Sequence, residues 1–189
     1  MKIIVEISAR HIHLSEGDFF AIFGKNASLT IKKQLSQPGQ FACLERVDVT
    51  GPKGTIKGIS VLGPFRKNTQ LEFSITDSRK IGIVPFVRES NDIKGTPGCK
   101  ITGPVGEIEI PQGVIIAKRH IHLSPQIAEE QRIKNGQIVS VKVNSGERSL
   151  IFGETVVRVS EEYSPAFHID TDEANAAGIS GETNGTIII

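Results

Sequence analysis

The sequence predicts a mostly β fold, built from barrels or from a sandwich. The first observation is a series of short β-branched segments separated by Gly-Pro, Lys-Gly, Asn-Gly or Ser-Gly turns. The second is composition: 19 glycines and 9 prolines accompany one tyrosine, one methionine and no tryptophan, which is typical of many short strands and tight turns. The third is an internal repeat, which divides the chain into two related halves.

Length and charge exclude several classes of protein. The 189 residues fit one large domain or two small ones, and 22 basic against 21 acidic side chains leave a net charge of +1. Such a balance gives no long-range attraction for nucleic acid or for an anionic membrane. No apolar run approaches the roughly 18–20 residues of a membrane span, and the opening MKIIVEISAR lacks the apolar core of a signal peptide. We therefore expect no nucleic-acid partner and no membrane partner.

The repeat is an identical hexamer, RHIHLS, at Arg10–Ser15 and again at Arg119–Ser124. It carries four of the five histidines. A weaker echo relates TGPKG, which starts at Thr50, to TGPVG, which starts at Thr102. Two copies are too few for a solenoid, so we interpret them as two halves that each give an equivalent piece to one site.

Each hexamer follows an apolar segment, Ile3–Ile7 or Gly113–Ala117, that predicts a strand. Each ends in a serine suited to cap a helix. We expect one helix between Ser15 and Gly24, and another that starts at Pro125 and ends near Gly136. A third helix is predicted at Asp172–Ala177, ended by Gly178. Further strands are predicted at Asp48–Thr50, Ile56–Leu62, Leu71–Ile75, Val84–Val87, Glu107–Ile110, Ile138–Val143, Ser149–Phe152, Thr155–Val159 and Thr186–Ile189.

The paired histidines predict a metal site. Residues i and i+2 of a strand share a face, so His11 projects with His13, and His120 with His122. Two adjacent imidazoles suit a metal better than a core, because each ring has two nitrogens to satisfy. His168 has carboxylates nearby for ligation or for hydrogen bonds to ligands. Alternatively, the hexamer preserves only a strand-to-helix turn, with its histidines facing water.

A nitrogen-rich site with a carboxylate suits Zn, Co, Ni or Fe(II). Four or five histidines exceed the three protein ligands of one catalytic zinc, so two metals are expected. Cys43 and Cys99 lack C-x-x-C spacing, and we interpret both as buried small hydrophobes in a protein of the reducing cytosol.

The segment 63–72 has a different character. A Gly-Pro turn leads into Arg66 and Lys67, which could hold an anion; arginine binds phosphate through two hydrogen bonds. Taken alone, such an arginine is more often a surface residue. By the same reasoning Glu72 alone would be a solvent-facing strand residue, and Lys32-Lys33 a solvated helix face.

Together these motifs resemble the PduL-type phosphate acyltransferases, the phosphotransacylases of the phosphate propanoyltransferase family. The resemblance runs in order from near residue 5 to near residue 180, and rests on Ser8–Ser15, Gln37–Ala42, Gly63–Gln70, Arg119–Leu123 and His168–Ala176. It implies transfer of a short acyl group, acetyl or propanoyl, between coenzyme A and inorganic phosphate. It also implies two β-barrels capped by short helices, one from residues 1–9 with 118–189 and the other from 10–117, with the metal site between them.

The resemblance implies two divalent metals, usually zinc. His11 and His13 would bind the first, which would meet the coenzyme A sulfur. Arg66 would hold the phosphate. The second metal would be bound by His120, His122, His168 and Glu72, and weaker candidates for contacts to coenzyme A are Ser8, Arg10, Lys33 and Asn175.

Other expectations concern context. Members of the family that enter microcompartments carry an amphipathic N-terminal extension; only seven residues precede Ser8 here, so the expectation is a cytoplasmic enzyme without that targeting helix. A homodimer is compatible with paired barrels, although no single residue decides it.

Neither cysteine and no serine lies in a nucleophile motif, so we hypothesise direct attack of bound phosphate on the thioester. Two rivals remain open: a zinc hydrolase acting on a thioester or amide, and a non-catalytic, metal-stabilised assembly module. A TIM-barrel amidohydrolase needs typically ~250 residues, and a cupin would not need a second His-x-His.

Overall fold

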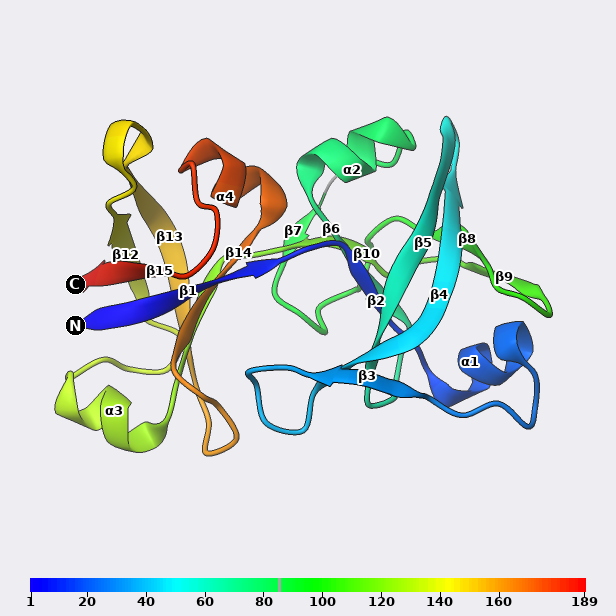
Figure 1. Cartoon of the computed structure of the whole chain (residues 1–189), viewed down its shortest axis with the longest axis horizontal. Helices are drawn as coiled ribbons and strands as arrows, with labels where there is room; N and C mark the ends of the chain where they lie inside the picture. The colour runs from blue at the N-terminus through cyan, green and yellow to red at the C-terminus, as the bar shows by residue number, and fades with distance from the viewer. Residues whose placement is uncertain (85) are drawn as a thin grey trace. The chain divides into compact units, whose positions relative to one another are not determined.

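The computed structural model describes residues 1–84 and 86–189. The chain forms two compact units (Figure 1). We call Met1–Ser8 with Lys118–Ile189 the barrel unit, and Ala9–Ala117 the sheet unit. The chain thus enters the barrel unit, leaves it for the sheet unit and returns.

The barrel unit is a closed six-stranded barrel. Strand β1 (Lys2–Ser8) runs parallel to β14 (Ala166–Asp170) and antiparallel to β15 (Thr183–Ile188). The circle is completed by β11 (His120–Leu123), β13 (Leu150–Val159) and β12 (Ile138–Val143). Its short helices are α3 (Pro125–Glu130), η1 (Gly146–Arg148) and α4 (Thr171–Ala176). Alternate β1 residues Ile3 and Val5 point into its core.

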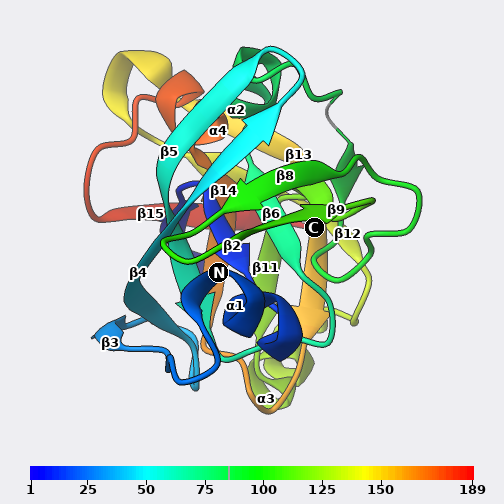
Figure 2. The same ribbon diagram turned by 90° about the vertical axis from the view of Figure 1, so that its right-hand side faces the viewer.

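The sheet unit is a curled half-barrel of nine strands, seen from another side in Figure 2. Eight of them follow the order β7 (Val87–Arg88), β10 (Val114–Ala117), β6 (Gln70–Phe73), β2 (His11–His13), β5 (Gly54–Gly63), β4 (Phe41–Gly51), β8 (Cys99–Thr102) and β9 (Glu107–Ile110). The ninth, β3 (Ile31–Gln34), pairs with β4. The helices are α1 (Glu16–Phe23) and α2 (Ile75–Lys80). Phe19 and Ile22 of α1 are fully buried in the core.

The sequence repeat is also a repeat of structure. Strand β2 lies between a parallel neighbour, β5, and an antiparallel neighbour, β6; strand β11 lies in the same way between β13 and β14. Ser15 and Ser124 cap the helices that follow β2 and β11. Each hydroxyl accepts a hydrogen bond from the backbone N–H three residues later, that of Asp18 or of Ile127. Helices α2 and α4 follow β6 and β14 and are capped by Ser74 and Asp170. Each unit therefore repeats one arrangement of three strands and two helices.

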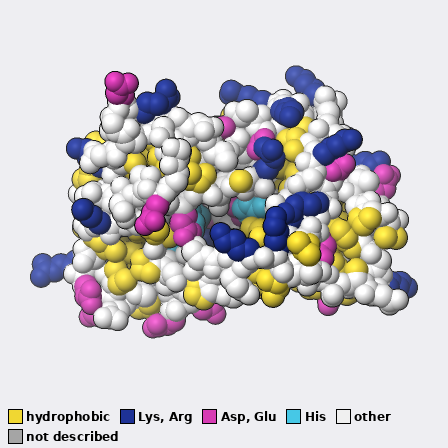
Figure 3. Space-filling model, in the orientation of Figure 1, with side chains coloured by type: hydrophobic (Ala, Val, Ile, Leu, Met, Phe, Trp, Pro, Cys, Tyr) yellow, Lys and Arg dark blue, Asp and Glu magenta, His cyan; other side chains and the backbone are white. Residues whose placement is uncertain are grey.

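The predicted mostly β fold with short capping helices is confirmed. Among the described residues, no helix is long and apolar enough to cross a membrane. Acidic and basic side chains are both present on the face shown in Figure 3, and some of the Lys and Arg side chains lie next to one another there.

Some elements differ from the sequence prediction. Lys32 and Lys33 lie on an exposed strand, β3, so the helix interpretation was wrong: β3 pairs along β4 instead. Helix α3 ends at Glu130, six residues before Gly136, because Arg132 takes a left-handed conformation with φ 56°. In the predicted strand Val84–Val87, only Val87 is in a strand, and Pro85 lies outside the described residues.

Two boundaries were also misplaced. Ile75 starts α2 rather than ending a strand, because the Ser74 hydroxyl accepts a hydrogen bond from the Asp77 N–H and caps a helix there. The segments 150–152 and Thr155–Val159 belong to the single strand β13, and Ser149 precedes it.

Candidate metal centres

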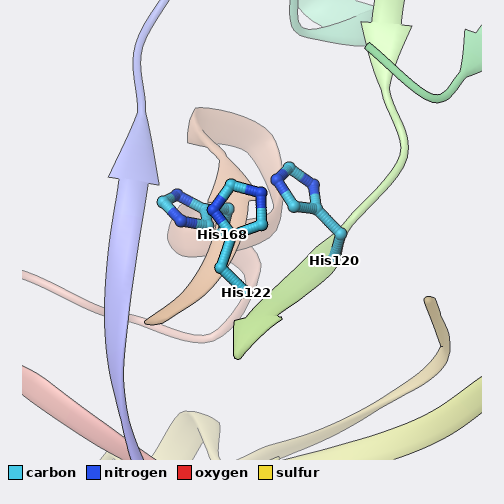
Figure 4. Close-up of side chains that lie close together, drawn as sticks. All are labelled: His120, His122 and His168. Carbon is cyan, nitrogen blue, oxygen red and sulfur yellow. The ribbon is translucent and has the colours of Figure 1, made fainter. Parts of the chain in front are cut away.

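Three histidines of the barrel unit come together on two neighbouring strands (Figure 4). His120 and His122 share one face of β11, and His168 lies on β14 directly opposite His120. One ring nitrogen of each lies within 4.8 Å of the others. Imidazole nitrogens this close are suited to surround one metal ion. We call these residues the three-histidine group.

Neighbouring oxygens orient two of these rings. The Nδ1 atom of His120 lies 2.8 Å from the backbone oxygen of Lys118. The Nδ1 atom of His168 lies 3.5 Å from a carboxylate oxygen of Glu6, its register partner on β1. When Nδ1–H donates to an oxygen, Nε2 keeps its lone pair for a metal. The two rings therefore resemble histidine ligands supported by an outer layer of acceptors.

His122 is held neutral. It is 6% exposed, and burial lowers its pKa, helped by the nearby His168, His120 and Arg158, to about 2. A neutral imidazole is the form that binds a metal. At neutral pH, therefore, His122 can bind a metal ion without first losing a proton.

A second cluster, in the sheet unit, contains His11, His13 and Glu72, and we call it the His-Glu group. One ligand atom of each lies within 4.8 Å of the others, and all three residues are buried or nearly so. The Nε2 atom of His11 is 3.5 Å from Glu72 Oε2, and its Nδ1 atom is 2.8 Å from the backbone oxygen of Ala9. This last contact repeats the contact between His120 and Lys118.

His13 shows most clearly that the His-Glu group fits a cation. Its side chain is 2% exposed, and within residues 1–84 and 86–189 its Nδ1 atom has no hydrogen-bond partner. Burial, followed by the charges of His11 and Arg66, lowers its pKa well below the ordinary value. A buried nitrogen without a proton or a donor partner is costly unless something else satisfies it. A metal ion would do so.

Glu72 is ionised in this setting. Burial raises the pKa of Glu72, but its interactions with His11 and His13, the Ser90 hydrogen bond and the charge of Arg66 together outweigh burial and lower it to about 2. The Ser90 hydroxyl donates a hydrogen bond of 2.8 Å to Glu72 Oε1, and the Gln70 amide donates one of 2.7 Å. A buried carboxylate beside two imidazoles gives the donor set of a divalent-metal site.

Arg66 lies beside the His-Glu group. Its Nη1 atom donates a hydrogen bond of 2.9 Å to Ser90 Oγ, and its backbone N–H donates one of 2.9 Å to the oxygen of Leu14, next to His13. Ser90 thus joins the arginine to Glu72. The predicted anion-binding residue is therefore brought to the predicted metal ligands, within a single unit.

Sequence reasoning missed Ser90 and Gln70. Gln70 could have been found, since it precedes Glu72 by two residues and so shares its face of β6. Ser90 lies 18 residues from Glu72 in a segment with no motif, and only the fold brings it there.

The remaining predicted residues fall into both units. Ser8, opposite Asp170, and Asn175, exposed on α4, belong to the barrel unit. Lys33 lies exposed on β3 of the sheet unit. In the same unit, Arg10 is half-exposed and forms an ion pair of 2.9 Å with Asp77.

Both cysteines are poor nucleophiles. Burial raises the pKa of the Cys99 thiol to about 12, and that of Cys43 to about 11. Both are therefore protonated at neutral pH. Their role as buried small hydrophobes is consistent with their places in the core of the sheet unit.

Comparisons with known proteins all match this chain to proteins of one name. The family model for phosphate propanoyltransferase matches residues 4–180. A phosphate propanoyltransferase of Thermotoga maritima is 52% identical over 175 residues, which are 93% of this chain and 83% of the relative. A protein of the same name from Clostridioides difficile is 48% identical, over 97% of this chain and 88% of its own length. Another, from Salmonella typhimurium, is 46% identical, over 91% of this chain and 81% of its own length.

Proposed function

The chain belongs to the phosphate propanoyltransferase family, a family of acyltransferases, and from this premise we propose its reaction. It transfers a short acyl group, acetyl or propanoyl, reversibly between coenzyme A and inorganic phosphate. The observation that carries this proposal is the family match over residues 4–180. The placement of Arg66 beside a buried His-Glu group supports it.

We propose further that the enzyme uses two divalent metal ions, with zinc as the expected ion. The ligands would come from the two groups described above: His11, His13 and Glu72, and His120, His122 and His168. When bound, such ions would supply positive charge for the thioester oxygen, the thiolate and the phosphate. Glu72 lies with His11 and His13, so within the sheet unit it is a third donor for that pair.

Arg66 is proposed to bind the phosphate. Its guanidinium is always charged and presents several N–H donors in one plane, which suits a phosphate oxygen pair. Its Nη1 atom is already held by Ser90 at 2.9 Å, so the group is oriented before phosphate arrives. Phosphate needs such orientation, because holding a reactant in place can be worth several kcal/mol of the barrier.

The acyl group is proposed to pass directly to phosphate. A covalent acyl-enzyme would need an activated nucleophile, and both cysteine thiols are buried with raised pKa values. In the proposed step, a phosphate oxygen forms a bond to the thioester carbon, and the carbon–sulfur bond breaks to release coenzyme A. Ser8, Arg10, Lys33 and Asn175 are proposed contacts for coenzyme A.

The decisive experiment combines metal analysis of the purified protein with an assay of its products. Acyl-CoA and phosphate are supplied, and acyl phosphate, free acid and free coenzyme A are measured separately. We expect acyl phosphate in step with coenzyme A, and loss of both after metal removal by a chelator. Free acid instead would favour a hydrolase, and no turnover in metal-loaded protein would favour an assembly module.

A further inference from the structure

Tyr163 covers one face of the His122 ring. The two ring centroids are 3.8 Å apart and the planes differ by only 10°, so the rings are stacked. The His122 ring also lies 4.7 Å from the rings of His120 and of His168, at steeper angles. His122 is therefore confined by its fellow ligands and by one aromatic side chain that is not a ligand.

The loop that carries Tyr163 is fixed to the same strand as His122. The Ser160 N–H donates a hydrogen bond of 3.1 Å to the oxygen of Leu123, the residue after His122, and the Tyr163 N–H donates one of 3.1 Å to Ser160. Arg158, the register partner of His122 on β13, places its guanidinium 5.7 Å from the Tyr163 ring centre. Tyr163 is thus held by a hydrogen bond of its backbone and by the Arg158 guanidinium near its ring.

The phenol oxygen takes no part in this arrangement. Among the described residues, the Tyr163 hydroxyl has no hydrogen-bond partner, so the contact with His122 is made by the ring face alone. The sheet unit offers a natural comparison, since His13 occupies the place of His122 there. Within the described part of the chain, no phenyl or phenol ring stacks on His13.

We infer that Tyr163 is a positioning residue that orients His122 for metal binding in the three-histidine group. The inference rests on the metal sites proposed above. An imidazole bound to a divalent ion becomes electron-poor, and an electron-poor ring is attracted to the negative face of a phenol more strongly than a free imidazole is. The stacking therefore favours the metal-bound state, in addition to limiting rotation of His122.

The composition makes this inference measurable. Tyr163 is the only tyrosine and the chain has no tryptophan, so tyrosine emission comes from this position alone. Metal-free protein is titrated with Co²⁺, an open-shell ion that quenches nearby fluorophores. We expect the emission to fall as the three-histidine group fills. A His13→Ala variant, which keeps only the three-histidine group complete, should give the same quenching.

Affinity is then measured with Zn²⁺ against a competing chelator in the His13→Ala background. Tyr163→Leu should weaken Zn²⁺ binding roughly tenfold, as loss of outer support for a ligand commonly does. Tyr163→Phe keeps the ring face and should stay within about twofold of the parent. In the complementary His122→Ala background, where the His-Glu group remains, Tyr163→Leu should leave Zn²⁺ affinity unchanged.

Three results would overturn the inference. Equal Zn²⁺ affinity in Tyr163→Leu and its parent would show that stacking does not support the site. Equal losses in the Phe and Leu variants would assign the effect to the hydroxyl. If Tyr163→Leu fails to fold, the Co²⁺ titration of the parent protein still tests the inference. Tyrosine emission that stays unchanged at full Co²⁺ occupancy would exclude the placement of Tyr163 against the three-histidine group. No metal binding at all in the His13→Ala protein would instead remove the proposed three-histidine metal site, and the inference with it.

Discussion

Glu72 and His168 occupy equivalent positions in the two units. Each lies directly opposite the first histidine of a His-Ile-His segment, on the antiparallel neighbour of that strand: Glu72 opposite His11, and His168 opposite His120. The two candidate metal centres therefore share one backbone arrangement and differ in their third donor. If each group holds a divalent ion, the carboxylate would lower the positive charge of one centre, and the imidazole would leave the other more electrophilic.

This equivalence predicts that the third donor can be exchanged. Glu72→His should retain metal binding in the His-Glu group, because the same position accepts a histidine in the barrel unit. Glu72→Ala should lose that ion while the three-histidine group keeps its own. Metal content after gel filtration, measured by mass spectrometry, checks both. Equal metal content in Glu72→Ala and the parent would contradict the assignment.

Arg66→Ala should lower the rate of acyl phosphate formation by ~10² or more, because one donor that positions developing charge has that order of effect. Metal content should not change, since Arg66 is not a ligand. Arg79→Ala, which removes an exposed arginine of α2, is the matched control and should retain full activity. Full activity of Arg66→Ala would remove Arg66 from the site.

Ser90→Ala should act through Arg66. The Ser90 hydroxyl accepts the hydrogen bond of Arg66 and donates to Glu72, so its loss removes one of the contacts that orient the arginine beside Glu72. Hydrogen bonds to charged groups are worth about 1.5–3 kcal/mol, which corresponds to roughly 10–100-fold in kcat/KM for phosphate. Kinetics in a double-mutant cycle test this: Ser90→Ala should have little further effect in Arg66→Ala. Additive losses would show that the two residues act independently.

The metal-free protein should lose stability as the pH falls from 7 to 5. Burial lowers the pKa of both His13 and His122, whereas an unfolded histidine titrates near 6.5. Below that pH the unfolded chain binds protons that the folded protein does not, so each residue removes up to about 1.4 kcal/mol per pH unit from the free energy of unfolding.

Urea unfolding at several pH values measures this slope. His122→Gln cannot take up that proton and should show a shallower slope than the parent. The lowered pKa of Glu72, about 2, does not interfere, because its stabilising effect is lost only as the pH falls below about 4.5. An equal slope in His122→Gln would show that His122 is not buried in its neutral form.

Gly98 and Gly54 should respond differently to alanine. A Cβ atom at Gly98 would lie 2.0 Å from the backbone oxygen of Ile110, whereas a Cβ at Gly54 would meet nothing within 4 Å. Gly98→Ala must shift backbone and should cost about 1–3 kcal/mol. Gly54→Ala should stay within about 0.5 kcal/mol of the parent. Thermal unfolding distinguishes them, and equal melting temperatures would contradict the close contact.

The sequence predicted the features that depend on the internal repeat and on the alternation of side chains along a strand. The two RHIHLS hexamers predicted strands followed by serine-capped helices, and both units contain them. Alternation also predicted that each histidine pair would share a face. Short helices were harder: α2 has six residues, and it lies in a segment whose β-branched residues favour a strand.

The site was predictable where its residues lie in motifs. His168 and Glu72 were predicted as candidate ligands and both were grouped with His120 and His122, but Glu72 lies with His11 and His13. The register positions of His168 and Glu72, opposite His120 and His11, depend on strand pairing between distant segments. Ser90 and Tyr163 lie in loops without regular periodicity. Their contacts depend on the hydrogen bonds between these loops and the strands. Composition and residue spacing do not predict such hydrogen bonds.

The carbonyl oxygens that orient His11 and His120 belong to Ala9 and Lys118, two residues with unlike side chains. A main-chain acceptor is present whatever side chain the position carries. The choice of which ring nitrogen stays available for a metal ion is thus protected from substitution at these two positions. Sequence drift there, or deliberate redesign of the linking segments, can proceed without altering the tautomer of either histidine, provided the backbone path is kept.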